Sequence, residues 1–308
     1  MKESRFLIID GNSIGFKASC AKSYYKDEMK TSNGLVVGTI YRFINMLNKI
    51  FNIVKPTHTI VCFDTPGKTF RHDIDGTYKA NRVKTSEKEM VYDQFLVIRK
   101  IFDLIGLKHD NVDLYEGDDL IGTYLKNSKA DKNFILSGDK DVFQLISDNT
   151  IVLFPIKGVS DIVYYDKNTL KNRFNVDVED FVEFKALMGD EGDNIAGVPG
   201  VGQKTAALLI NKFGNIENLM SNLDSDQSIR GWRRISTNIS NWDREKTLKL
   251  VTIVKDCPIN YTFEDCKINL NWKNAIPVFE QLEFKSFVRK VREEKFYNGK
   301  QIWKYWWI

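Results

Sequence analysis

Short apolar runs that lead into acidic residues recur along this chain, and they constrain its fold more than any other feature. The runs and the acids that follow them are Phe6–Ile9 with Asp10, Thr59–Phe63 with Asp64, and Asn133–Leu136 with Asp139 and Asp141. Each run has the length and composition of a buried strand. Helical periodicity over about Leu35–Ile53 and Met90–Ile105 separates the runs. The pattern predicts an α/β fold with a mixed, mainly parallel sheet flanked by helices.

The carboxyl ends of parallel strands meet at one edge of a sheet, where open α/β sheets bind their ligands. We therefore expect Asp10, Asp64, Asp139 and Asp141 to converge there. The alternative is that each aspartate only caps the turn that follows its strand. Gly11 and Asn12 are expected to form such a turn.

The second half of the chain is predicted to change character. Ile151–Phe154 and Ile162–Tyr165 are expected to form a hairpin around Gly158, and a helix is expected over Val142–Ile146. From Val176 onward the sequence indicates helices.

A second acidic group precedes the apolar helix LIGTYL. Glu116, Asp118 and Asp119 place three acids within four residues at the predicted helix start. Acids there interact favourably with the helix dipole, so capping is the simple alternative. Capping needs one or two acids, which leaves a third for another purpose.

The segment Lys185–Thr205 joins acids to a glycine-rich turn. Asp190 and Asp193 follow a helical run over Val178–Met188, and their spacing is expected to place them on one face of a helical turn. Glycines then lead into a predicted helix from Gln203 to Phe213 that stops at Gly214. The acids suit a metal ion, and the turn suits a phosphate at a helix start. A plain tight loop is the alternative. The turn is no Walker A loop, because Gln203 replaces the required glycine before Lys204.

Nine acids are candidates for one site. They are Asp10, Asp64, Glu116, Asp118, Asp119, Asp139, Asp141, Asp190 and Asp193. Together they would repel one another and also a nucleic acid, unless cations compensate them. The three histidines, His58, His72 and His109, are scattered. Oxygen ligands alone favour Mg²⁺ or Mn²⁺, and the number of acids favours two or more ions.

The stretch Thr65–Glu89 is polar and basic, and it is too long for an ordinary loop. It carries the basic residues Lys68, Arg71, Lys79, Arg82, Lys84 and Lys88, with Phe70 and Tyr78 between them. Basic side chains interleaved with aromatic ones suit a nucleic acid. The alternative is a solvated charged flap.

Composition limits the class of protein. The net charge of +4 and the pI of about 8.6 permit a nucleic-acid partner. Four cysteines without Cys-x-x-Cys spacing indicate reduced thiols. No apolar run approaches the length of a membrane span, and the N-terminus lacks a signal-peptide core. We expect a cytoplasmic monomer.

Several motifs together resemble the 5′ nuclease (flap endonuclease) family. The matching segments are Asp64 with GKTFR and YKANR, EGDD, SGDKDVFQL, LMGDEGDNIAGVPGVGQKTA and LEFKSFVRK. They are similar to the N-terminal nuclease domain of bacterial DNA polymerase I and to stand-alone phage 5′→3′ exonucleases. The motifs run from Asp10 to about Lys290, and their shared order makes the resemblance specific.

The resemblance implies a PIN-like α/β core with a helical arch, and a helical helix-hairpin-helix (H3TH) lobe that binds DNA. The expected division is a nuclease core over 1–184 with the arch at about 65–100, a helix-hairpin-helix region over 185–260, and a C-terminal helical segment with an apolar tail over 261–308.

The resemblance also implies an activity, which is Mg²⁺-dependent hydrolysis of phosphodiesters at 5′ ends, flaps and junctions, with RNA removal from RNA–DNA hybrids in some members. The nine acids correspond to the metal site, and Lys79 and Arg82 to arch residues near the scissile phosphate. Lys68 and Arg71 would hold neighbouring backbone, and Tyr78 would stack on a base. The remaining implied contacts are a potassium ion on the carbonyls of Val198 and Val201, and DNA contacts from Gly200, Gly202 and Lys204.

The C-terminal residues Ile302–Ile308 are unusually apolar and match no family pattern. They are expected either to pack on the core or to dock on a replication partner such as a clamp or a single-strand-binding protein. Two other functions stay open, a catalytically silent DNA-binding protein and a PIN-type ribonuclease. The source could be a bacterium or a phage.

Overall fold

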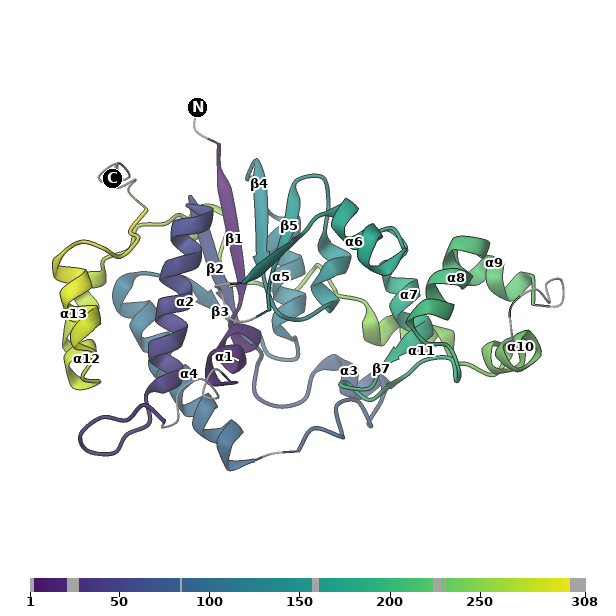
Figure 1. The fold of residues 1–308 in the computed structure, drawn as a ribbon, viewed down its shortest axis with the longest axis horizontal. Coiled ribbons are helices and arrows are strands. Elements are labelled where there is room, and N and C mark those ends of the chain that lie inside the picture. Colours follow the sequence, from purple (N-terminus) through teal and green to yellow (C-terminus); the bar gives the residue numbers. More distant parts are fainter. Residues whose placement is uncertain are drawn as a thin grey trace.

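A computed structural model describes residues 3–20, 28–83, 85–156, 161–223, 229 and 231–299. Its centre is a six-stranded sheet with the order β3-β2-β1-β4-β5-β6 (Figure 1). The strands are β1 Arg5–Asp10, β2 His58–Cys62, β3 His109–Asp110, β4 Lys132–Leu136, β5 Thr150–Pro155 and β6 Ile162–Tyr165. All neighbours are parallel except β5 and β6, which are antiparallel. The mixed, mainly parallel sheet is therefore confirmed.

Helices cover both faces of this sheet. The helices of the sheet layer are α1 Gly11–Cys20, α2 Gly38–Val54, α3 Phe70–Ile74, α4 Ser86–Ile105, α5 Gly117–Lys126, the 3-10 helix η2 Asp141–Leu145 and α6 Lys167–Phe174. In β1, Leu7 and Ile9 belong to a buried apolar cluster with residues of α1, α2 and α4. Phe6 and Ile8 belong to a second cluster with residues of α5. Side chains alternate across a strand, so a strand covered on both faces must be apolar throughout.

The helical lobe lies beyond β6 (Figure 1). Its elements are α7 Phe181–Met188, β7 Gly189–Asp190, β8 Ile195–Ala196, α8 Gln203–Phe213, α9 Ile216–Ser221, α10 Trp232–Ser240 and α11 Arg244–Val251. Helix α8 begins at Gln203 and ends before Gly214, whose positive φ of 81° is a conformation that glycine adopts readily. Both ends agree with the prediction.

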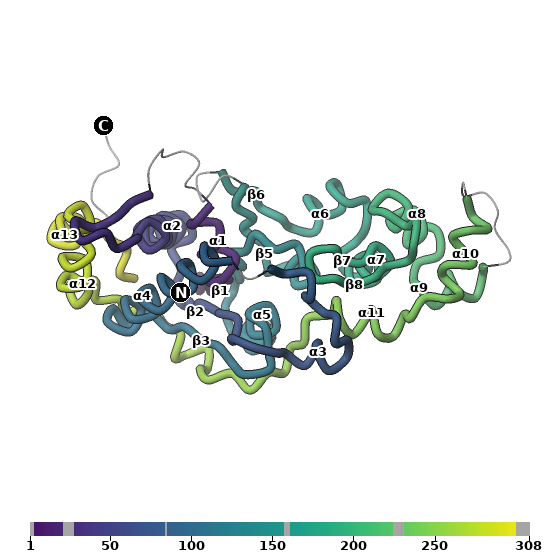
Figure 2. Tube along the Cα trace, turned by 90° about the horizontal axis from the view of Figure 1, so that it is seen from below, coloured from purple at the N-terminus to yellow at the C-terminus, as the bar shows by residue number. Residues whose placement is uncertain are grey.

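The last elements run back past the sheet, and only the final two helices lie at the end of the molecule opposite α10 (Figure 2). They are η4 Glu264–Cys266, η5 Trp272–Ala275, α12 Ile276–Gln281 and α13 Lys285–Arg292. The ring of Phe287 in α13 stacks on Tyr41 of α2 at 4.5 Å between centroids. The apolar tail Ile302–Ile308 lies outside the described residues, as does Gly158.

Two of the local predictions for these elements were wrong. Gly11 and Asn12 begin α1 instead of forming a turn, because the Asp10 side chain accepts the N–H of Ser13 and starts the helix. A β-carbon on Gly11 would lie 2.5 Å from the Phe63 ring, so this start requires glycine. The helix predicted over Val142–Ile146 is confirmed as the 3-10 helix η2, one residue earlier in the chain. The region after Val176 is not wholly helical, since β7 and β8 pair as a short antiparallel hairpin.

In the part of the chain that the structure describes, no helix has both the length and the apolar character required to cross a membrane.

Candidate active site

A pocket of about 490 Å³ opens at the carboxyl edge of the sheet. Its acidic lining comes from separate segments, namely Asp10, Asp64, Glu116, Asp118, Asp139 and Asp193. Lys79 and Arg82 line the same pocket. Asp10 ends β1, and Asp64 and Asp139 follow β2 and β4. The predicted convergence is therefore found for six of the nine acids.

Hydrogen bonds fix the carboxylates that come from the sheet. Asp10 accepts the hydroxyl of Ser137 at 2.6 Å on one oxygen and the N–H of Ser13 at 2.8 Å on the other. Asp64 accepts the N–H of Gly117, the first residue of α5, at 2.8 Å. These bonds hold β1, β2, β4 and α5 in register around the pocket.

Burial makes the pocket unfavourable for negative charge. It raises the pKa of Asp10 to about 7. It also raises the pKa of Asp118, and the nearby charges of Asp139 and Asp10 add to that increase. A cation placed among these carboxyl groups would stabilise their ionised form and lower their pKa values.

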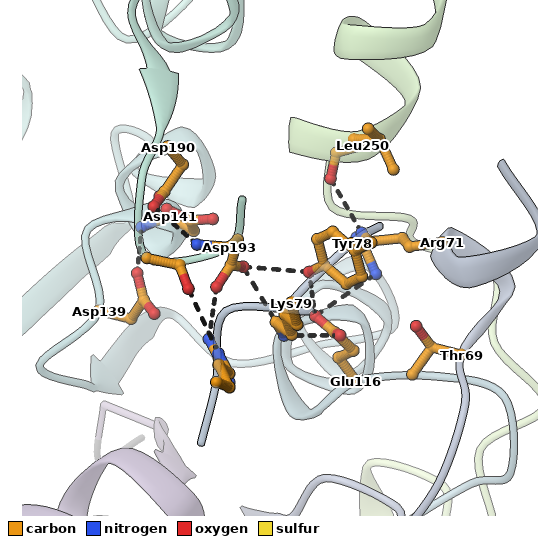
Figure 3. A network of polar contacts seen from close by, with 12 residues as sticks. Thr69, Arg71, Tyr78, Lys79, Glu116, Asp139, Asp141, Asp190, Asp193 and Leu250 are labelled. Carbon is orange, nitrogen blue, oxygen red and sulfur yellow. Dashed lines mark hydrogen bonds and ion pairs between the residues drawn. The ribbon is translucent and has the colours of Figure 1, made fainter. Parts of the chain in front are cut away.

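Two of the pocket acids are paired with side chains from the basic stretch (Figure 3). The Lys79 ammonium lies 2.6 Å from Glu116 and 3.7 Å from Asp193, and the Arg82 guanidinium also pairs with Asp193. Although burial favours the neutral acid, Lys79 and Arg82 hold the pKa of Asp193 below its usual range. Burial likewise favours neutral Lys79, but Glu116 and Asp193 raise its pKa above the ordinary value. Lys79 is therefore a protonated group inside the site.

The backbone around Lys79 rests on the turn between β7 and β8. Lys79 has a φ of 56°, which few residues other than glycine adopt, and its N–H donates to the carbonyl of Asp193 at 2.9 Å. The amide of Asn194 donates to the carbonyl of Thr77 at 2.7 Å, and that of Asn81 donates to Glu191. Asp190 ends β7, and Asp193 lies within the turn that leads to β8, where its N–H donates to the Asp190 carboxylate at 3.2 Å. The two acids therefore lie on a hairpin and not on the predicted helical turn.

Asp141 and Asp190 pair with Lys185, a residue that the sequence analysis did not select. The Lys185 ammonium lies 3.1 Å from Asp190 and also bonds Asp141. Lys185 is only 5% exposed, in the last turn of α7. A lysine five positions before Asp190, in an otherwise apolar helix end, was the available indication.

Asp119 does not join the pocket, contrary to the prediction. It is fully buried and forms a two-pronged ion pair with Arg71, at 2.7 and 2.8 Å. Arg71 is itself 3% exposed and cannot hold a DNA backbone in this arrangement. Tyr78 is also buried, and its hydroxyl lies 3.0 Å from Glu116 and from Asp193. Its predicted stacking on a base was therefore wrong for this arrangement.

Other predicted DNA contacts lie on the surface. Lys68, Gly200, Gly202 and Lys204 are exposed. Val198 and Val201 are buried, and the carbonyl of Val198 accepts the N–H of Val201 at 3.0 Å. Their potassium site stays a prediction.

The donor chemistry of the pocket fits hard divalent cations, because its acids supply only oxygen. Among the described residues, no three Asp, Glu, His or Cys side chains are grouped closely enough to hold an ion directly. Lys79, Arg82 and Lys185 occupy positions among the acids and neutralise part of their charge. A bound cation would therefore require some of these side chains to move.

Two family models match the chain. Residues 5–175 match the 5′-3′ exonuclease N-terminal resolvase-like domain, and residues 176–274 match the 5′-3′ exonuclease C-terminal SAM fold.

This chain belongs to the 5′-3′ exonuclease family.

Curated relatives of this exonuclease-family chain include bacterial DNA polymerases. DNA polymerase I of Bacillus subtilis (strain 168) is 30% identical over 298 residues, which are 95% of this chain and 33% of that protein. DNA polymerase I of Lactococcus lactis subsp. cremoris is 33% identical over 299 residues, which are 94% of this chain and 33% of that protein. The chain thus spans about a third of the length of these relatives.

Solved structures share the fold of this exonuclease-family chain. T5 5′-exonuclease with bound zinc gives a TM-score of 0.65 at 21% identity, covering 96% of this chain and 100% of that chain. The catalytic core of Rad2 in complex with DNA substrate gives a TM-score of 0.59 at 14% identity, and the match covers 94% of this chain and 92% of that chain. The PIN-like sheet with its helical SAM-like lobe is therefore confirmed.

Proposed function

We propose that this protein is a structure-specific 5′ nuclease, acting as a 5′→3′ exonuclease and flap endonuclease on branched or 5′-ended DNA and on RNA–DNA hybrids. The observation that carries the proposal is one pocket in which acids of five separate segments lie together with the cations Lys79 and Arg82. We propose that it acts in DNA replication or repair, in the cytoplasm of a bacterium or of a phage host.

Two groups of acids would hold two or more Mg²⁺ or Mn²⁺ ions. The first group is Asp10, Asp64, Glu116 and Asp118, and the second is Asp139, Asp141, Asp190 and Asp193. Such ions lower the pKa of an attacking water and stabilise the leaving oxygen. A relative supports metal binding, because T5 flap endonuclease was solved with DNA and metal ions.

Lys79 and Arg82 would bind the scissile phosphate. They pair with Glu116 and Asp193, and both side chains line the pocket. A phosphate offers the same kind of acceptor as these carboxylates, so both cations can exchange one partner for the other. Lys79 would then stabilise the charge that develops on the phosphate.

The exposed residues Lys68 and Lys204, with the turn at Gly200 and Gly202, would hold the DNA backbone away from the pocket. The start of α8 supports this role, because its free N–H groups and dipole favour a phosphate. The carbonyls of Val198 and Val201 would hold a potassium ion, whose positive charge would favour a nearby phosphate of the duplex.

Cleavage of a 5′-labelled flap substrate tests the nuclease activity. We expect cutting near the junction with Mg²⁺ and none in EDTA, and loss of cutting in Asp139→Asn while DNA binding persists. Tight binding of branched DNA without any cutting by the unaltered protein would favour a silent DNA-binding protein. Preference for single-stranded RNA over the flap would favour a PIN-type ribonuclease.

The tail Ile302–Ile308 would dock on a clamp or a single-strand-binding protein. Deleting it should leave flap cutting unchanged and abolish binding to the partner, measured by co-sedimentation. Unfolding of the truncated protein would instead show that the tail packs on the core.

A further inference from the structure

The Arg71–Asp119 pair is the most deeply buried ion pair among those between described residues, with side chains 4% and 0% exposed. All four hydrogen-bond positions of the Asp119 carboxylate are filled by donors. Oδ1 accepts from Arg71 at 2.8 Å and from the N–H of Val254 at 3.0 Å. Oδ2 accepts from Arg71 at 2.7 Å and from the N–H of Glu116 at 3.1 Å. The position is therefore specific for a carboxylate.

This pair joins three segments that are distant in sequence. Arg71 lies in α3 at the base of the basic stretch, and Asp119 lies in the first turn of α5. Arg71 also donates to the carbonyl of Leu250 at 2.9 Å and to that of Thr252 at 2.9 Å, where α11 leaves the helical lobe (Figure 3). The two family domains, which meet between residues 175 and 176, are connected here.

The same pair influences the pocket through the first turn of α5. Asp119 holds the N–H of Glu116, and Glu116 with Asp118 lines the pocket. The Arg71 guanidinium itself lies 3.8 Å from the Glu116 carboxylate. The orientation of the first turn of α5 thus depends on this buried ion pair. The positions of Glu116 and Asp118, which that turn carries into the pocket, depend on it too.

We infer that Arg71 and Asp119 are positioning residues, which set the orientation of Glu116 and Asp118 by anchoring α5 to the exit of the helical lobe. Neither residue is part of the pocket lining. The kinetic part of the inference rests on the proposed nuclease function, whereas its metal-affinity part does not.

Asp119→Asn and Arg71→Met test the inference. Asparagine keeps the size of the Asp119 side chain. Its amide N–H groups, however, would face N–H donors that now bind the carboxylate, and would leave them without an acceptor. Lys171→Met is a matched control, because Lys171 forms an exposed ion pair with Asp177 away from the pocket. For each protein we would measure folding by circular dichroism, Mg²⁺ affinity by calorimetry, DNA affinity in EDTA, and kcat and KM on the flap.

We expect Asp119→Asn to remain folded at 20 °C, to lower kcat at least tenfold and to weaken Mg²⁺ binding at least fivefold. KM and DNA affinity should change less than twofold, and the control should match the unaltered protein. The double variant should be no more impaired than the worse single variant, because both changes remove one interaction. Arg71→Lys should recover only part of the kcat that Arg71→Met loses, because one ammonium group cannot make the paired hydrogen bonds of a guanidinium.

Two results would overturn the inference. If folded Asp119→Asn keeps normal kcat and Mg²⁺ affinity, the pair only stabilises the fold. If Arg71→Met weakens DNA binding tenfold while Asp119→Asn does not, Arg71 is a DNA contact. Absence of flap cutting by the unaltered protein would refute the proposed function instead, and the Mg²⁺ affinities would still decide the role of the pair.

Discussion

At the scale of single residues, the ionised forms of the pocket acids Asp10 and Asp118 oppose folding when no cation compensates them. The folded-state pKa of Asp118 lies above its unfolded value because of burial and neighbouring acids. Its contribution to stability is therefore present at low pH and is lost as the pH rises above the unfolded value near 4.

Asp118→Asn should stabilise the metal-free protein at pH 8 by roughly 1 kcal/mol, a typical size for one substitution, because it removes a charge from a buried cluster. It should also lower the cleavage rate at least about a hundredfold, because a candidate ligand is lost. Urea unfolding in EDTA and flap cleavage measure the two effects. Asp148→Asn, at a side chain that is 93% exposed, is the control and should change neither. A less stable Asp118→Asn would contradict the repulsion argument.

Lys79→Ala should lower kcat by about 10²–10³-fold with little change in KM, the size typical for loss of one electrostatic contact in a transition state. The reason is that its protonated ammonium already lies in the pocket, 2.6 Å from Glu116. Single-turnover cleavage at saturating enzyme measures the effect on the chemical step. A rise in KM alone would assign Lys79 to ground-state binding.

The sequence predicted which acids exist but not which way each one faces. Asp118 and Asp119 are neighbours, and successive helical residues point about 100° apart. Asp118 therefore reaches the pocket, while Asp119 turns toward Arg71. Arg71 and Tyr78 look like nucleic-acid contacts in the sequence because composition does not reveal burial.

At the scale of elements, long periodic segments were predictable and the β7–β8 hairpin was not. Helix α8 carries apolar periodicity and a glycine stop, which fix both of its ends. Strands β7 and β8 have two residues each, which is too short for any periodic pattern. The hairpin nevertheless decides where Asp190 and Asp193 lie.

Gly189→Ala should destabilise the protein by about 2–3 kcal/mol and impair cleavage, because backbone strain and a clash coincide there. Gly189 has a φ of 71°, and an added β-carbon would lie 2.2 Å from the N atom of Gly197. Gly76→Ala is the matched control, with nothing within 4 Å of the added carbon and no positive φ. Thermal unfolding compares the two variants, and equal melting temperatures would refute the argument.

At the scale of the whole molecule, a continuous apolar cluster joins the sheet to the helical lobe. It contains Phe6 and Ile8 of β1 together with Leu209 of α8 and Ile239 of α10. The sequence could show that each segment was apolar, but the continuity of the core depends on tertiary packing. Two family domains thus share one interior.

We expect these two regions to unfold as one cooperative unit, because exposing either one would uncover the apolar surface of the other. Native-state hydrogen exchange in increasing denaturant measures this. The most protected amides of β1 and of α8 should reach the same free energy of opening. A lower value for α8 would show that the lobe opens on its own.

The place of β1 in the sheet has a consequence for biosynthesis. Strand β1 pairs with β2 on one side and with β4 on the other, although β4 begins at Lys132. During synthesis, β1 therefore leaves the ribosome with one edge that stays unpaired until more than 120 further residues have followed. During that interval an apolar strand with a free edge can pair with other chains. Translation speed between β2 and β4, and chaperones that bind extended apolar segments, should thus govern how much of this protein reaches its native state.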